Sequence, residues 1–268
     1  MSLMAEVDLL GELVLKNLKV RYSRPVLGLF WAFLHPFFTA VVFYIVFSII
    51  LKVKTENVPF FLYLMSAVFP WHFLQNSLMG SVTSLVDNKN LIKESRFSHY
   101  LIPVSIVLAN GVNLLFPLAL LLVISAVILK GLPIFVIFMP LVLAINFAVA
   151  VGLSVAASVL YVRWRDANYI LEIILLLLFY MTPVFYSLRL AEAALGPFLF
   201  QVYMCNPFVG MLCLYRFTIL KGFYSGAEKN IGPLYLFVLP LIFAAAVLFF
   251  GFYLYTRNKD RINDHLSY

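Results

Sequence analysis

Five charged side chains form a polar island in an otherwise apolar chain. They lie in the stretch VDNKNLIKESRFSHY, residues 86–100, and are Asp87, Lys89, Lys93, Glu94 and Arg96. Only 12% of the whole chain is charged, and long apolar runs flank this stretch on both sides. Mixed charge and helix-compatible residues predict a short, exposed polar helix that can contact a partner. A solvated loop is the alternative interpretation.

The motifs that bind metals or nucleotides are missing from the sequence. The four histidines are scattered, without an HExxH-like spacing, and no G-x-x-x-x-G-K-[ST] stretch is available to hold the phosphates of ATP. Cys205 and Cys213 have a spacing that fits neither a metal site nor a disulfide framework. We therefore expect no catalytic residue, no metal and no cofactor in this chain. A transport protein without such sites either conducts its substrate passively or takes its energy from a separate subunit.

The composition places the chain in a membrane. Of its 268 residues 64% are hydrophobic, whereas a soluble domain has about 45–50% apolar and about 25% charged residues. The net charge of +7 fits membrane orientation and anionic lipid headgroups better than nucleic acid.

Six segments are long and apolar enough to cross about 30 Å of hydrocarbon, which takes about 20 residues. They are residues 29–51, 59–86, 103–129, 133–161, 169–188 and 233–255. A seventh apolar segment, residues 195–220, contains Pro197 and the pair Asn206-Pro207. Because the residue before a proline avoids helical geometry, we expect this segment to break into two half-length helices. We interpret it as a re-entrant pair that dips in from the outer face, where protein or a cavity must cover its backbone.

The distribution of lysine and arginine predicts the orientation. With six spans, twelve of these residues lie on the side of the two termini and seven on the other. The positive-inside rule therefore puts both termini in the cytoplasm. Residues 1–25 are predicted to form an amphipathic helix in the membrane interface, either as a simple anchor or as a collar that contacts a partner. Its expected apolar face contains Leu3, Val7, Leu10, Val14 and Leu18, opposite Asp8, Glu12, Lys16 and Lys19.

The predicted fold class is an all-α membrane protein with a single domain, residues 1–268. It has six transmembrane helices, an N-terminal amphipathic interface helix, and an outer re-entrant helix pair between spans five and six.

Aromatic residues mark a candidate route for a substrate. They lie near one face of the first span, well inside the second, and in the outer half of the fifth. They are Phe30, Phe33, Phe37, Tyr44, Trp71, Phe73, Tyr180, Phe185 and Tyr186. Aromatic faces can stack on the C–H faces of sugars without fixing them in place, as a sliding glycan requires. Packing inside the bundle is the alternative for each residue taken singly.

The order of several motifs is similar to that of one family. After the amphipathic start come RYSRPVLGLFWAFLHPFF (residues 21–38), AVFPWHFLQNSL (67–78), NKNLIKESRF (88–97), YVRWRDANYI (161–170), MTPVFYS (181–187) and CNPFVGMLCLYRFTI (205–219). In this order the sequence resembles the membrane (permease) subunit of ABC transporters that export polysaccharides of the O-antigen, capsule or teichoic acid type. The likeness covers nearly the whole chain. It departs at FSHYLIP, residues 97–103, where relatives often have a proline soon after the phenylalanine.

The resemblance implies a homodimer in the bacterial cytoplasmic (inner) membrane that encloses a channel for a lipid-linked polysaccharide. Two copies of a separate ABC-type ATPase would supply the energy and hold ATP and Mg²⁺. A coupling helix at residues 87–99 would contact this ATPase through Asn88, Lys89, Asn90, Leu91, Ile92, Lys93, Glu94, Arg96 and Phe97. Arg21 and Arg24 would meet the pyrophosphate of an undecaprenyl-type carrier at a cytoplasmic gate, since arginine suits phosphate geometry. Membrane anchoring explains these two arginines equally well.

Three other functions fit parts of the sequence. A permease of the same architecture that exports a drug or another lipid would favour a closed dimer interface lined by leucine and valine. A membrane-embedded glycosyl or lipid transferase would need a catalytic carboxylate, for which Asp166 is the only candidate and has no evident partner. A passive channel would conduct without ATP.

Overall fold

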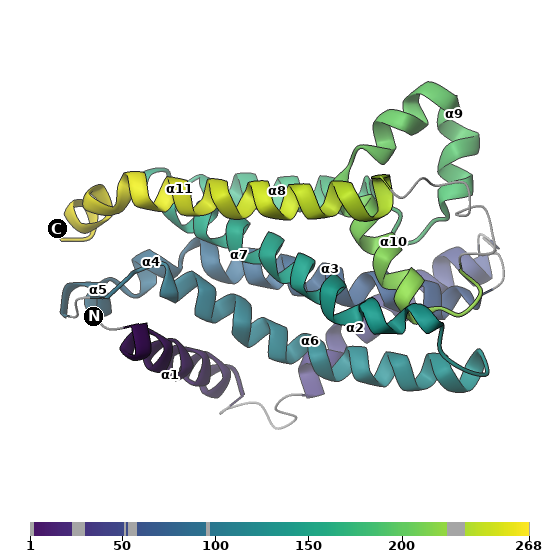
Figure 1. Cartoon of the computed structure of the whole chain (residues 1–268), viewed down its shortest axis with the longest axis horizontal. Helices are drawn as coiled ribbons and strands as arrows, with labels where there is room; N and C mark the ends of the chain where they lie inside the picture. The colour runs from purple at the N-terminus through teal and green to yellow at the C-terminus, as the bar shows by residue number, and fades with distance from the viewer. Residues whose placement is uncertain are drawn as a thin grey trace.

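The computed structural model describes residues 3–22, 30–50, 52, 58–94, 97–223 and 234–267, and every element within these ranges is helical. In chain order the α-helices are α1 (Leu3–Tyr22), α2 (Phe30–Phe43), α3 (Phe60–Val82), α4 (Ser84–Asp87), α5 (Lys89–Glu94), α6 (Leu101–Ile128), α7 (Met139–Arg163), α8 (Ala167–Tyr180), α9 (Leu188–Met204), α10 (Pro207–Ile219) and α11 (Leu239–Ser267). Shorter π- and 3-10-helical segments are η1 (Tyr44–Ile50), η2 (Ile134–Phe138) and η5 (Leu234–Val238). The long helices run lengthwise in one bundle (Figure 1).

Helix α3 lies at the centre of the bundle, and most of its residues are buried. It packs against α2, α6, α7, α8 and α10, and the main apolar cluster joins its side chains to those of these neighbours. Serines lie where α3 meets other helices. Ser77 O, for example, accepts a hydrogen bond from Ser154 Oγ of α7. These small side chains let the helix backbones approach closely, as is usual in membrane bundles.

Helices α7 and α11 make the most extensive helix–helix contact, and glycines allow it. A Cβ atom added at Gly152 of α7 would lie 2.6 Å from the carbonyl carbon and oxygen of Val247 in α11. One added at Gly251 of α11 would collide with the backbone of Gly152. At this crossing the two backbones are therefore in direct contact.

Three described helices are long and apolar enough to cross a membrane: Leu101–Ile128, Ile134–Arg163 and Tyr235–Lys259. The chain is thus a multi-pass membrane protein. The apolar helices Phe37–Ile50 and Ala167–Tyr180 coincide with two further expected spans but are shorter. The expected span at 169–188 is shortened because the chain turns after Tyr180, where Thr182-Pro183 stands. The count of six spans remains a prediction.

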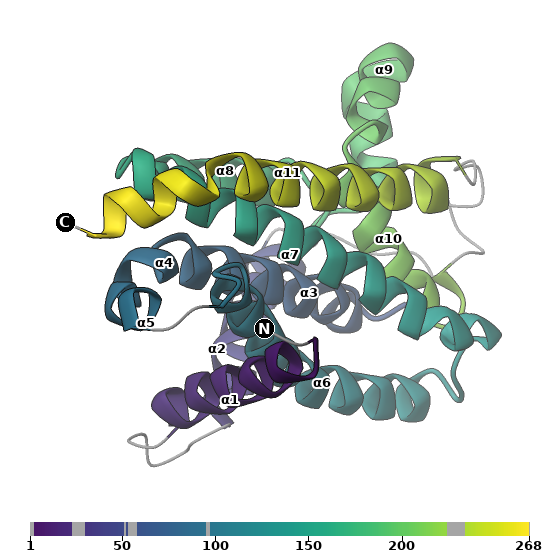
Figure 2. The ribbon, with the colours of Figure 1, turned by 60° about the vertical axis from the view of Figure 1, so that its left-hand side comes forward.

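The segment at 195–220 breaks next to the prolines that the sequence singled out. Gly196, just before Pro197, has φ 70° and ψ 172° and kinks α9. Asn206 is extended, and its Oδ1 accepts a hydrogen bond from Phe208 N at 3.0 Å, which caps α10. Helices α9 and α10 meet at 94°. Helix α10 is buried in the bundle, whereas α9 projects from one end of it (Figures 1 and 2).

Candidate functional site

The predicted coupling segment, residues 88–97, lies at the end of the bundle opposite α9 (Figure 1). Its helix is α5, as expected from the charge pattern. Ile92 and Phe97 are buried in a separate apolar cluster, here called the end cluster, and Leu91 packs against it. The end cluster consists of Leu13, Leu85, Ile92, Phe97, Leu101, Ile102, Val155, Val159, Tyr255 and Ile262.

The opposite side of α5 is polar and exposed. Its exposed residues are Lys89, Asn90, Lys93 and Glu94, while Asn88 is half-buried. Arg96 lies outside the described residues. The segment therefore combines an apolar underside anchored in the bundle with a charged outer surface, an arrangement suited to docking a soluble protein.

Helix α1 is tied to both ends of the coupling segment. Lys16 Nζ donates a hydrogen bond to Asn88 Oδ1 at 3.2 Å, and Ser98 Oγ donates to Glu6 Oε1 at 2.6 Å. Leu13 of α1 enters the end cluster. These contacts place α1 beside the coupling segment, where a collar would lie.

The expected apolar face of α1 is divided between protein contact and exposure, and neighbouring leucines join the packed part. Leu9, Leu10 and Leu13 pack toward the bundle, whereas Val7 is 60% exposed. Met4 is exposed as well. The helix therefore has two apolar sides, one packed against the protein and one free, because the packed side is chosen by neighbouring helices rather than by hydropathy alone.

The C-terminal end of α11 completes this part of the molecule. His99 N donates a hydrogen bond to the Tyr255 hydroxyl at 3.0 Å, and Ile262 is buried in the end cluster. Burial, together with the nearby charge of Lys259, lowers the pKa of His99 below its usual value. His99 is therefore a neutral buried side chain near neutral pH.

Two of the predicted channel aromatics lie in the core of the single chain. Trp71 and Phe73 are buried, with the Trp71 ring 5.6 Å from that of Phe179 and the Phe73 ring 4.8 Å from that of Phe147. Both therefore have close packing partners within one copy of the chain, and their part in a channel remains a prediction.

A third channel candidate, Phe185, is also buried, and it stacks on Phe47. The remaining candidates lie nearer the surface or outside the described side chains. Phe37, Tyr44 and Tyr186 are half-buried and pack against neighbouring apolar clusters. Tyr180 is 54% exposed. The side chains of Phe30, Phe33 and Arg21 and the whole of Arg24 lie outside what the structure describes.

One polar residue was missed as a site residue: Arg216 in α10. It is one of the seven lysine and arginine residues that the predicted topology places on the outer side, but its side chain is fully buried. Its guanidinium carbon lies 3.5 Å from the centre of the Tyr63 ring, and Nη2 donates to the carbonyl oxygens of Pro183 and Val184. Within the described part of the chain, Nε and Nη1 have no hydrogen-bond partner. Its place inside the apolar run LCLYRFTIL was the available signal.

Arg216 joins three elements. Through Tyr63 it contacts α3, and through the two carbonyl groups it holds the turn that follows α8. Tyr63 OH donates to Tyr186 O at 2.8 Å and so fastens the same turn. The arrangement fixes the apolar helices around the start of α9.

The remaining question is whether the described side chains could bind a metal ion or act as a catalytic carboxylate. Within the described ranges, no group of three or more histidine, cysteine, aspartate or glutamate residues is placed to hold a metal ion. Asp166, the candidate for a transferase, is exposed at the start of α8 and makes no side-chain cap there.

Comparisons with known proteins identify the family of the chain. The chain is 28% identical over 220 residues to the O-antigen export system permease protein RfbA of Myxococcus xanthus, covering 82% of this chain and 83% of that protein. Two proteins of the same name from Klebsiella pneumoniae are each 27% identical, over 224 and 217 residues; both alignments cover 80% of this chain and 81% of the relative. The family described as ABC-2 type transporter matches residues 9–220. The expected relationship is confirmed: the chain belongs to the ABC-2 type transporter family.

Proposed function

We propose that this chain is the transmembrane subunit of an ATP-driven exporter that moves a lipid-linked polysaccharide across the bacterial cytoplasmic membrane. The observation that carries the proposal is its similarity, over about four fifths of its length, to permeases named for O-antigen export. A chain of this class moves the substrate, while ATP and Mg²⁺ belong to a separate ABC-type ATPase.

The ATPase docks on the coupling segment in this proposal. Support comes from α5, whose charged side is exposed while its underside is anchored by Ile92 and Phe97. A partner that pushes on α5 acts on α1, α6, α7 and α11 together, because all of them contribute to the end cluster.

The proposed topology has six spans with both termini in the cytoplasm, beside the ATPase. Helices α1 and α5 and the C-terminal half of α11 lie near one another, which supports a common side. The α9–α10 pair is the re-entrant segment of the opposite face, and the 94° bend between its helices supports this role.

Two copies of the chain, with two ATPase copies, enclose the channel in this proposal. Tyr180 is exposed and therefore suited to face a shared path, while Trp71 and Phe73 would support it from behind. Arg21, in the last turn of α1, and Arg24, three residues further along the sequence, would receive the carrier pyrophosphate at the cytoplasmic gate.

Co-purification tests the energy source. The tagged chain is extracted from its native membrane in mild detergent, and the proteins that accompany it are identified by mass spectrometry. We expect a stoichiometric soluble subunit that carries a P-loop. If no such subunit appears even after gentle crosslinking, the chain lacks the proposed energy source, and the channel and transferase hypotheses take its place.

Charge reversal tests the docking surface. Lys89→Glu combined with Lys93→Glu reverses two positive charges of the proposed docking surface. Because complementary charges select the partner, we expect at least about tenfold less ATPase retention and surface glycan. The matched control is Lys52→Glu with Lys130→Glu, two exposed lysines in loops at the other end of the bundle. The combination of Lys93 and Arg96 reversals is a second test of the same surface.

The readouts separate the alternatives. Unchanged ATPase retention together with unchanged surface glycan in both coupling variants contradicts the assignment of residues 88–97. Loss of ATPase binding with normal glycan points to a permease for a drug or another lipid.

A further inference from the structure

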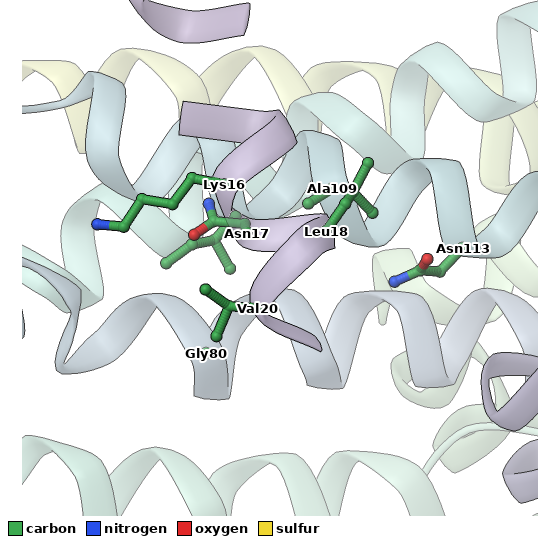
Figure 3. Close-up of a pocket in the computed structure, with 8 residues that line it drawn as sticks. Lys16, Asn17, Leu18, Val20, Gly80, Ala109 and Asn113 are labelled. Atoms are coloured by element: carbon green, nitrogen blue, oxygen red, sulfur yellow. The ribbon is translucent and has the colours of Figure 1, made fainter. Parts of the chain in front are cut away.

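A pocket of about 370 Å³ lies where the C-terminal half of α1 meets α3 and α6. Lys16, Leu18 and Val20 line it from α1, Gly80 from α3, and Ala109 and Asn113 from α6 (Figure 3). Most of this wall is hydrocarbon. The lack of a side chain at Gly80 keeps the pocket open on the α3 side, where an added Cβ would already lie 3.2 Å from Ile106.

Asn113 is the unusual residue of the pocket. It is 8% exposed, and neither its Nδ2 nor its Oδ1 has a hydrogen-bond partner among the residues that the structure describes. Figure 3 shows its amide directed toward the side on which Leu18 lies. A buried amide that offers a free donor and a free acceptor is unfavourable unless a ligand or water satisfies it, so its presence needs an explanation.

The depth of Asn113 indicates which ligand atoms it would meet. Helix α6 has 28 residues, which corresponds to about 42 Å, whereas the hydrocarbon core is about 30 Å thick. The surplus can extend beyond the membrane at the start of α6, where the helix packs in the end cluster. The first large apolar side chain that α6 exposes is Val112, at 43%. Asn113 lies about 18 Å along α6, so with about 12 Å of the helix outside the membrane it is within about 6 Å of the boundary between hydrocarbon and headgroups.

The charge at the pocket favours an anionic headgroup. Lys16 lines the pocket and donates one hydrogen bond, to Asn88 Oδ1. An ammonium group has three donors, so two others are available for a phosphate. Lys19 lies one turn further along α1 and is exposed. Both lysines raise the local affinity for an anion at the membrane surface.

We propose that this pocket binds one anionic glycerophospholipid. Its phosphate lies at Lys16, a glycerol or ester oxygen bonds to Asn113, and a chain runs along Leu18, Val20 and Ala109. A polyprenyl phosphate fits less well, because it would place pure hydrocarbon against the Asn113 amide. The site is independent of the export proposal, and a lipid bound there holds α1 against α6 and, through the contact between Lys16 and Asn88, steadies the coupling segment.

Native mass spectrometry of the full chain tests this site. The protein is released from nanodiscs of phosphatidylcholine that contain a minor fraction of phosphatidylglycerol, and the retained lipids are counted. We expect one phosphatidylglycerol per chain, held in preference to phosphatidylcholine. Ala109→Phe fills the pocket and Asn113→Leu removes the amide, so each is expected to lower this retention at least about tenfold. Val112→Phe adds a similar volume on the exposed side of α6 and is expected to retain the lipid.

Three results would overturn the proposal. The first is equal retention of the two phospholipids by the unmodified chain. The second is undiminished retention in Asn113→Leu, a variant with the same number of side-chain heavy atoms that remains informative if Ala109→Phe does not fold. The third comes from a parallel arm with added undecaprenyl phosphate, in which that lipid displaces phosphatidylglycerol from the unmodified chain and does so less from Asn113→Leu.

Discussion

Replacing Gly152 with alanine is expected to force α7 and α11 apart. The new Cβ would lie 2.6 Å from the backbone of Val247, whereas ordinary contact begins at 3.4 Å. The backbones must therefore separate by about 0.8 Å, the difference between these distances. No side-chain rotation can relieve this contact, because both of the opposing atoms belong to the main chain.

The size of the effect follows from the loss of packing. A gap of about 0.5–1 Å forfeits a quarter to a half of the attraction between facing atoms, and overpacking costs about 1–3 kcal/mol. The better helix propensity of alanine offsets up to about 1 kcal/mol. We expect a net loss of about 1 kcal/mol, which for a chain of this size lowers the melting temperature by roughly 2–4 °C.

Thermal unfolding in detergent, followed by size-exclusion chromatography of the surviving protein, measures this change. Gly11→Ala is the matched control, since a Cβ at this exposed position of α1 meets no atom within 4 Å. The control should melt at the same temperature as the unmodified chain or slightly above it, because alanine favours the helix. If Gly152→Ala melts no lower than the unmodified chain, the direct backbone contact between α7 and α11 is refuted.

Two further predictions concern buried polar groups. Arg216→Met removes the donor to the carbonyl groups of Pro183 and Val184, and we expect a melting temperature several degrees lower; Arg216→Lys should not restore it, because an ammonium group lacks the planar fork of arginine. Full rescue by lysine would contradict this. His99 has a lowered pKa, so below about pH 6.5 the unfolded chain binds a proton that the folded chain resists, and stability should fall as the pH decreases through that range. Melting curves between pH 7.5 and pH 5 should show this slope and lose part of it in His99→Phe; identical slopes would contradict it.

Rules that depend only on neighbouring residues predicted where the helices break. Features that depend on tertiary packing, such as the packed side of α1, could not be predicted in this way. The breaks at Gly196 and Asn206 follow from the residue that comes next, since a proline restricts its predecessor wherever it stands. The position of α5 likewise followed from charge in a short window. By contrast, the wheel could not tell which part of α1 packs on the protein: Leu13, which lies off its apolar face, enters the end cluster, while Val7 is exposed, because this choice depends on α6 and α5.

Arg216 shows why a count of charges was insufficient. Its neighbours in sequence are apolar, and its partners, Tyr63 and the carbonyl groups of the turn after α8, lie far away along the chain. Only the folded arrangement reveals that the guanidinium replaces water with an aromatic face and two carbonyl oxygens. The orientation rule holds without it, because removing an outer charge strengthens the excess on the side of the termini.

The end cluster explains how a force on α5 can reach the membrane. Phe97 and Ile92 share this cluster with Leu13 of α1, and the hydrogen bond of His99 to Tyr255 joins the start of α6 to α11. A rigid, close-packed cluster transmits displacement instead of absorbing it. We infer that α1, the start of α6 and the end of α11 move with α5, whereas α9, at the other end of the bundle, follows only through the long helices. Helix rigidity along α7 and α11 then matters for export as well as for stability, and Gly152 lies where these two helices meet.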